Sequence, residues 1–197
     1  MKYNFDIQHR RSIRLRGYDY SHAGAYFVTI CSYKRECIFG EIHNSAIMLN
    51  EFGQIVLAKW NNIPVHFINA ELDLYIIMPN HIHGIIVLNN IDVGAKHFHQ
   101  KNTSNDNPSQ NASPLRAMPH GTKPGSLSAI IQNFVSVSTR KMNQFRKTAG
   151  AKLWQRNFYE HIIRNEKELN ALREYIVNNP LNWDSDENNP NNIKTQL

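Results

Sequence analysis

The stretch Met78-Pro79-Asn80-His81-Ile82-His83-Gly84-Ile85-Ile86 carries two histidines inside a segment that is otherwise typical of a buried strand. Side chains two positions apart on a β-strand point to the same side. His81 and His83 therefore share one face, about 7 Å apart along the strand, and Ile82 points to the other. Two imidazoles on one face can hold a single metal ion. A lone His-x-His pair is weak support for a site, so its meaning depends on the rest of the chain.

Apolar periodicity and turn residues on both sides of this stretch define the other elements. The sequence predicts strands at 25–32, 71–78, 81–88 and 153–163, and helices at 50–63, 126–142 and 165–179. The first six elements read βαββαβ, which is an α+β, ferredoxin-like (RRM-like) fold with an antiparallel sheet and helices on one face. We expect the strand at 81–88 to be central and the last helix to lie across the open face of the sheet.

The chain of 197 residues suits one domain. We expect a basic arm over 1–20, a folded domain over 21–183 and a disordered, Asn- and Asp-rich tail over 184–197. Residues 89–125 are rich in Asn, Ser, Pro and Gly, which predicts a mobile loop inside the domain.

The charge of the chain favours a polyanionic partner. The formal net charge is +6, and the sequence from Lys123 to Arg156 has seven Lys or Arg and no acid. The arm over 1–20 mixes arginines with tyrosines, a combination that suits single-stranded nucleic acid. A solvated basic surface and a frayed terminus are the plainer explanations. The candidate DNA contacts are Arg10, Arg11, Arg14, Arg16, Arg140, Lys141 and Arg156.

Two cysteines give no disulfide framework, which favours a reducing compartment. The N-terminus carries no apolar signal core, and no apolar run approaches the roughly 18 residues that span a bilayer. We therefore expect a cytoplasmic protein that is not associated with a membrane.

The predicted last helix carries Tyr175, with Asn179 one turn further on the same face. A tyrosine at the edge of a packing face is most often amphipathic filler, with a packed ring and a wet hydroxyl. Its alternative role is that of a nucleophile. Tyr159 is a rival nucleophile, but it falls in a predicted strand and has no amide one helical turn later.

Taken together, His81-Ile82-His83 after Met78-Pro79-Asn80, and Tyr175-Ile-Val-Asn-Asn179-Pro180, resemble the HUH single-tyrosine transposases. The closest group is the REP-associated tyrosine transposases of bacteria. Three further pieces match in the same order: Arg11–Tyr20, Gly24–Ile30 and Leu153–Arg164. The resemblance spans about residues 10–183, without the loop at 89–120.

The resemblance implies metal-dependent cleavage and rejoining of single-stranded or hairpin DNA. Tyr175 would attack the phosphorus and form a 5′-phosphotyrosine, while His81, His83 and Asn179 hold Mg²⁺ or Mn²⁺. Better-known members have glutamine at the position of Asn179, so this shorter amide reaches the ion directly or through water, or Asn178 replaces it. The family includes proteins that act as a monomer and others that act as a homodimer.

Two other function classes compete with this interpretation. A DNA-binding module without catalysis, acting on single-stranded or hairpin DNA, would need none of the three residues His81, His83 and Tyr175. A zinc hydrolase could use the two histidines, but it requires a third strong ligand that the sequence does not identify.

Overall fold

The computed structural model describes residues 18–90 and 122–192. The predicted DNA contacts of the N-terminal arm, and residues 91–121 of the predicted loop, lie outside the described residues. Those arm residues are Arg10, Arg11, Arg14 and Arg16. None of the helices in the two described ranges combines the length and the apolar character that a bilayer span requires.

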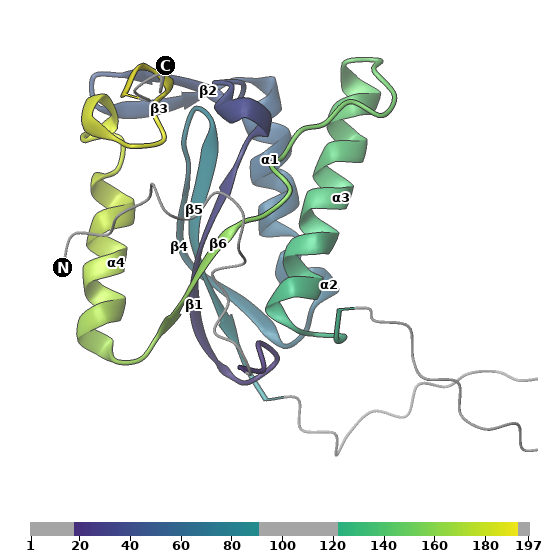
Figure 1. Ribbon diagram of the computed structural model, residues 1–197, viewed down its shortest axis with the longest axis vertical. Coiled ribbons are helices and arrows are strands. Elements are labelled where there is room, and N and C mark those ends of the chain that lie inside the picture. Colours follow the sequence, from purple (N-terminus) through teal and green to yellow (C-terminus); the bar gives the residue numbers. More distant parts are fainter. Residues whose placement is uncertain (1–17, 91–121, 193–197) are drawn as a thin grey trace, which may run out of the picture.

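A four-stranded antiparallel sheet forms the centre of the molecule (Figure 1). Its strands, in spatial order, are β4 (Ala70–Ile77), β5 (His81–Leu88), β1 (Gly24–Cys31) and β6 (Tyr159–Ile163). Each neighbouring pair runs antiparallel. The predicted ferredoxin-like sheet is thus confirmed, and β5 is one of its two central strands.

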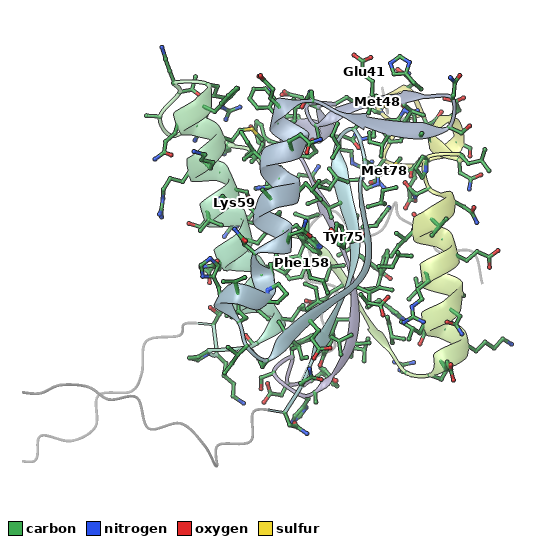
Figure 2. All side chains as sticks on the ribbon, turned by 180° about the vertical axis from the view of Figure 1, so that it is seen from behind. Glu41, Met48, Lys59, Tyr75, Met78 and Phe158 are labelled. Atoms are coloured by element: carbon green, nitrogen blue, oxygen red, sulfur yellow. The ribbon has the colours of Figure 1, made fainter. Side chains whose placement is uncertain are left out.

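The helices divide between the two faces of the sheet (Figure 1). One face is covered by α1 (Glu51–Asn61) and α3 (Leu127–Phe145), with the short α2 (Ile63–His66) after α1, and the other face by α4 (Glu166–Asn178). Side chains fill both layers (Figure 2).

Strand alternation assigns each side chain of β5 and β1 to one of these layers. The larger core, under α1 and α3, includes the buried side chains of Val28, Ile82 and Ile86. The smaller core, under α4, is built on Phe27 and Ile85. Because His81 and His83 have the same parity as Ile85, both histidines face α4.

A two-stranded hairpin that the sequence analysis did not identify lies beside the sheet. It pairs β2 (Gly40–His43) with β3 (Ala46–Leu49). Asn44 and Ser45 connect them with φ of 48° and 59°, as a type I′ turn requires. Asn-Ser is a weaker hairpin signal than Asn-Gly, and the strands have only four residues each, which is why the pattern did not stand out.

The last strand is shorter than the predicted 153–163. Leu153 and Trp154 are buried in the larger core instead of extending β6, and the indole Nε1 of Trp154 donates to Ser138 Oγ on α3 at 2.9 Å. Only an isolated bridge joins Trp154 to Ser32. The apolar pattern of a strand and that of a segment packing into a helix layer are alike over so few residues.

The prediction of disorder from residue 184 is wrong for residues 184–192. This segment forms two short turns, η3 (Trp183–Ser185) and η4 (Pro190–Asn192). Asparagine side chains close the turns by donating to backbone carbonyls, as Asn189 does to Trp183 at 3.0 Å. The Asn-rich composition that suggested disorder supplies these local hydrogen bonds.

A bidentate ion pair fastens α4 to the edge strand β4. The guanidinium of Arg173 donates to both carboxylate oxygens of Asp73, at 2.9 and 2.6 Å. Asp73 sits at a register shift between Leu72 and Tyr75, where the strand bulges. The bulge thus directs a carboxylate toward the helix that carries Tyr175.

We expect Asp73→Asn to lower the stability of the protein in a pH-dependent way. The hydrogen bond from Arg173 lowers the pKa of Asp73, so the stabilisation is present above the unfolded pKa of about 4 and is lost as the pH falls through the lowered folded value. Urea midpoints should differ between wild type and variant at pH 6–8 and converge in strong acid. Asp184→Asn, at an exposed carboxylate, is the control. A gap that persists unchanged at pH 2 would contradict this account.

Candidate active site

The histidine pair lies on central strand β5, against α4. His83 pairs with Thr29 and His81 with Cys31 across the β1–β5 register. Both imidazoles are buried, and their ring centroids are 4.4 Å apart. The same-face placement expected from the sequence is confirmed.

Asn80 fixes the orientation and the protonation of His81. The Asn80 amide nitrogen donates to the carbonyls of Arg35 and Asn188, at 2.9 and 2.7 Å. Its oxygen therefore faces the Nδ1 atom of His81, at 2.8 Å. An amide oxygen can only accept, so Nδ1 carries the proton and Nε2 of the neutral ring keeps its lone pair.

His83 is held in a similar way between β1 and α4. Its Nδ1 atom lies 2.8 Å from the hydroxyl of Thr29. Its Nε2 atom lies 3.2 Å from the hydroxyl of Tyr175. A threonine hydroxyl can donate or accept, and in the tautomer with the proton on Nδ1 the Nε2 lone pair accepts the Tyr175 hydroxyl.

Both histidines are neutral at physiological pH. Burial lowers the pKa of His83 to about 3. Burial also lowers the pKa of His81 well below its usual value, and a proton on His83 or the charge of Arg35 acts in the same direction. Neutral imidazoles are the form that binds metal ions, so the site does not need to release protons from these rings first.

Asn179, at the C-cap of α4, completes the inner wall of the site. It is buried, and its side chain is close enough to His81 and Tyr175 to affect the pKa of each, although less than burial does. Asn179 Oδ1 and His81 Nε2 are both buried without a hydrogen-bond partner among the described residues. Leaving such atoms unpaired costs about 1–3 kcal/mol each, so the pair favours a ligand that both can contact.

The ring of Tyr175 is packed, and its hydroxyl lies against His83. Its ring lies 6.1 Å from Phe27 and 5.1 Å from His83, both in edge-on geometry. The residue is nevertheless 43% exposed, so a substrate can reach it. Burial of the hydroxyl raises the pKa of Tyr175 above its usual value, and the negative charges of Asp186 and Glu187 add to this shift. A bound cation would act in the opposite sense.

The ordered tail brings a carboxylate to the histidines. Ligand atoms of His81, His83 and Asp186 all lie within 4.8 Å of one another. Asp186 is positioned by the backbone N–H of Asn188, which donates to its Oδ1 at 2.6 Å. Two imidazoles and a carboxylate are a donor set that can hold a divalent ion, and the unpaired Nε2 of His81 fits that role.

The sequence analysis missed Asp186 because it assigned this segment to a disordered tail. The available signal was Trp183, an aromatic residue just after the last helix, which is uncommon in a disordered tail. In the structure its ring lies 6.1 Å from that of His81.

No family model matches the chain. A search among curated proteins found a relative in Haemophilus influenzae, described as an uncharacterized protein, that is 40% identical over 191 residues. The aligned region covers 94% of this chain and 96% of the relative. The chain belongs to the same family as this Haemophilus influenzae protein.

Among solved structures, that of the REP-associated tyrosine transposase bound to a REP hairpin is similar in fold to this protein. The TM-score is 0.52 at 17% sequence identity, with 88% of this chain and 74% of the other covered. At this identity the similarity establishes the fold: a four-stranded antiparallel sheet with helices on both faces.

The three predicted basic residues that lie in the described ranges do not gather at the site. Arg140 and Lys141 are exposed on α3, in the layer on the other side of the sheet from Tyr175 (Figure 1). Arg156 is exposed in the segment that leads to β6. Their role in binding DNA stays a prediction.

We expect the ion-binding set to be His81, His83 and Asp186. His81→Ala should weaken Mn²⁺ binding at least tenfold, because it removes a nitrogen ligand whose orientation is fixed. Asp186→Asn should weaken binding less, and Asp184→Asn, two residues earlier and exposed, should leave it unchanged. Mn²⁺ titration followed by electron paramagnetic resonance, with circular dichroism as the test of folding, measures this. If a folded His81→Ala protein bound Mn²⁺ as tightly as the wild type, the assignment of this ion-binding set would be wrong.

Proposed function

We propose that this protein nicks and rejoins single-stranded DNA through a covalent bond to Tyr175, with a divalent ion, Mg²⁺ or Mn²⁺, held beside it. The observation that carries the proposal is the 3.2 Å contact between the Tyr175 hydroxyl and His83 Nε2. It puts a candidate nucleophile next to a candidate metal ligand. The protein of similar fold was bound to a REP hairpin, and we extend that class of partner, single-stranded or hairpin DNA, to this chain.

In the proposed reaction the Tyr175 oxygen forms a bond to the scissile phosphorus. The bond from phosphorus to the 3′ oxygen breaks, the tyrosine gives up its proton, and the leaving oxygen takes one to become a 3′-hydroxyl. The DNA then carries its 5′ phosphate on Tyr175. Because the phosphodiester energy is kept in that link, a 3′-hydroxyl can attack it and reverse the step without a nucleotide cofactor.

The side chains around Tyr175 have separate roles in this proposal. His81 and His83 hold the ion through Nε2, and Asn80 and Thr29 keep those atoms pointing inward. Asp186 and Asn179 offer oxygen ligands. When bound, the ion would polarise the phosphate and favour the ionised form of the nearby phenol.

We expect Tyr175→Phe to abolish a covalent protein–DNA adduct. Wild-type protein incubated with hairpin-bearing single-stranded DNA and Mn²⁺ should give a slower band on a denaturing gel, because the phosphotyrosine bond survives denaturation. Tyr159→Phe is the matched control: Tyr159 is half-buried on β6, on the same side of the sheet, and its removal should leave the adduct in place. An adduct with Tyr175→Phe would refute the assignment of the nucleophile.

The same variant separates catalysis from ion binding. The Tyr175 hydroxyl and an ion compete for the single lone pair on His83 Nε2. Tyr175→Phe should therefore bind Mn²⁺ as tightly as the wild type or more tightly, as measured by isothermal titration calorimetry. Weaker binding would mean that the phenol itself supports the ion, and the proposed division of roles would fail.

A zinc hydrolase is the second candidate, and the structure removes one objection to it. The sequence offered no third strong ligand, whereas Asp186 now stands beside His81 and His83, and zinc accepts two imidazoles and a carboxylate. The accessible tyrosine at the ligand set favours strand transfer. Hydrolysis of another substrate with Zn²⁺ alone, without any adduct, would favour the second candidate.

A further inference from the structure

A tight turn at the end of β1 is tied to the candidate active site. The turn η2 (Tyr33–Arg35) starts two residues after Cys31, the strand partner of His81. The N–H of Ser32 donates to the carbonyl of Asn80 at 2.7 Å, and Asn80 in turn donates to the carbonyl of Arg35 at 2.9 Å. The residue that orients His81 thus also holds both ends of this turn.

Two lysine ammonium groups lie over the aromatic ring of the turn. Lys34 Nζ is 5.7 Å and Lys152 Nζ is 5.3 Å from the centroid of the Tyr33 ring. Lys152 arrives from a distant segment, which is fixed by the hydrogen bond from Tyr33 N–H to the carbonyl of Leu153 at 2.7 Å. Both lysines are exposed and the tyrosine is half-buried.

The backbone of this turn is strained. Lys34 and Arg35 are consecutive residues with φ of 56°, in the left-handed region that side chains with a Cβ disfavour. Such residues persist where the surroundings force them, and they concentrate at ligand clamps. Here the hydrogen bonds of Ser32 and Asn80 hold the turn in this conformation. The result is an aromatic ring with two cations over it, on a turn that is hydrogen-bonded to Asn80.

We propose that Tyr33, Lys34 and Lys152 form a subsite for single-stranded DNA next to the scissile phosphate. A base stacks on the Tyr33 ring in place of an ammonium group, and the displaced lysine side chains contact the phosphates beside that base. A single strand is required because the bases of a duplex are stacked on one another and present only their edges. This subsite rests on the proposed function, since it places substrate on the path to Tyr175.

A pair of probes separates stacking from charge. The first is an oligothymidylate of about ten nucleotides, and the second is an abasic strand of the same length, with the phosphates but no bases. Fluorescence anisotropy should give about tenfold weaker binding of the oligothymidylate to Tyr33→Ala, and unchanged binding of the abasic strand. Tyr33→Phe should bind as the wild type does, because it keeps the ring.

The lysine variants should change the salt dependence of binding, and their effect should be the same with and without bases on the strand. Lys34→Gln and Lys152→Gln should each weaken both probes and reduce the slope of log affinity against log salt by about 0.7. Lys167→Gln is the matched control, because Lys167 is exposed in the first turn of α4, at the end of the helix opposite Tyr175. It should leave the slope unchanged.

The outcomes distinguish the subsite from the proposed function. Equal loss of both probes on Tyr33→Ala, or no loss of either, overturns the stacking role, even where Tyr175 still forms the DNA adduct. The absence of any adduct or strand binding in the wild type overturns the proposed function and the subsite together.

Discussion

The site depends on one amide, that of Asn80. Its nitrogen donates to two backbone carbonyls, one from the turn after β1 and one from the C-terminal segment, so its oxygen can only accept from His81. This buried network fixes the tautomer of His81 and leaves a lone pair facing the site. The same atoms hold the Tyr33 turn and the Asp186 segment against the end of β5.

The rest of the fold gives this interaction its geometry. β5 lies between β4 and β1, so neighbouring strands shield its histidines from solvent. Helix α4 covers the face of the sheet to which these histidines point (Figure 1). The Asp73–Arg173 pair fastens α4 to the edge strand β4. Packing of Phe27 and Ile85 against Ile176 then sets the helix so that Tyr175 meets His83.

The main strands and helices, and the shared face of His81 and His83, could be predicted because each depends on a local period: two along strands and about four along helices. The features that could not be predicted depend on contacts distant in sequence. Asp186 becomes a candidate ligand only because Asn80 and Arg35 hold the segment that carries it.

Local sequence patterns were also misleading where the same pattern is compatible with two different structures. At the start of α4, Asn165 and Glu168 have the spacing of a capping box. Asn165 Oδ1 does accept from Glu168 N–H, but the Glu168 carboxylate accepts from Arg164 N–H and contacts His161, one residue earlier than the standard box. In the same way, Leu153 and Trp154 have the apolar character of a strand but pack under α3.

The most direct test of the central claim is the protonation state of the two imidazoles, observed in long-range proton–nitrogen correlation spectra of ¹⁵N-labelled protein. The account predicts that at neutral pH His81 and His83 both carry the proton on Nδ1, and that the Nε2 signals of both shift when a diamagnetic divalent ion such as Mg²⁺ is added. A proton on Nε2 of either ring, with no change on adding the ion, would contradict it.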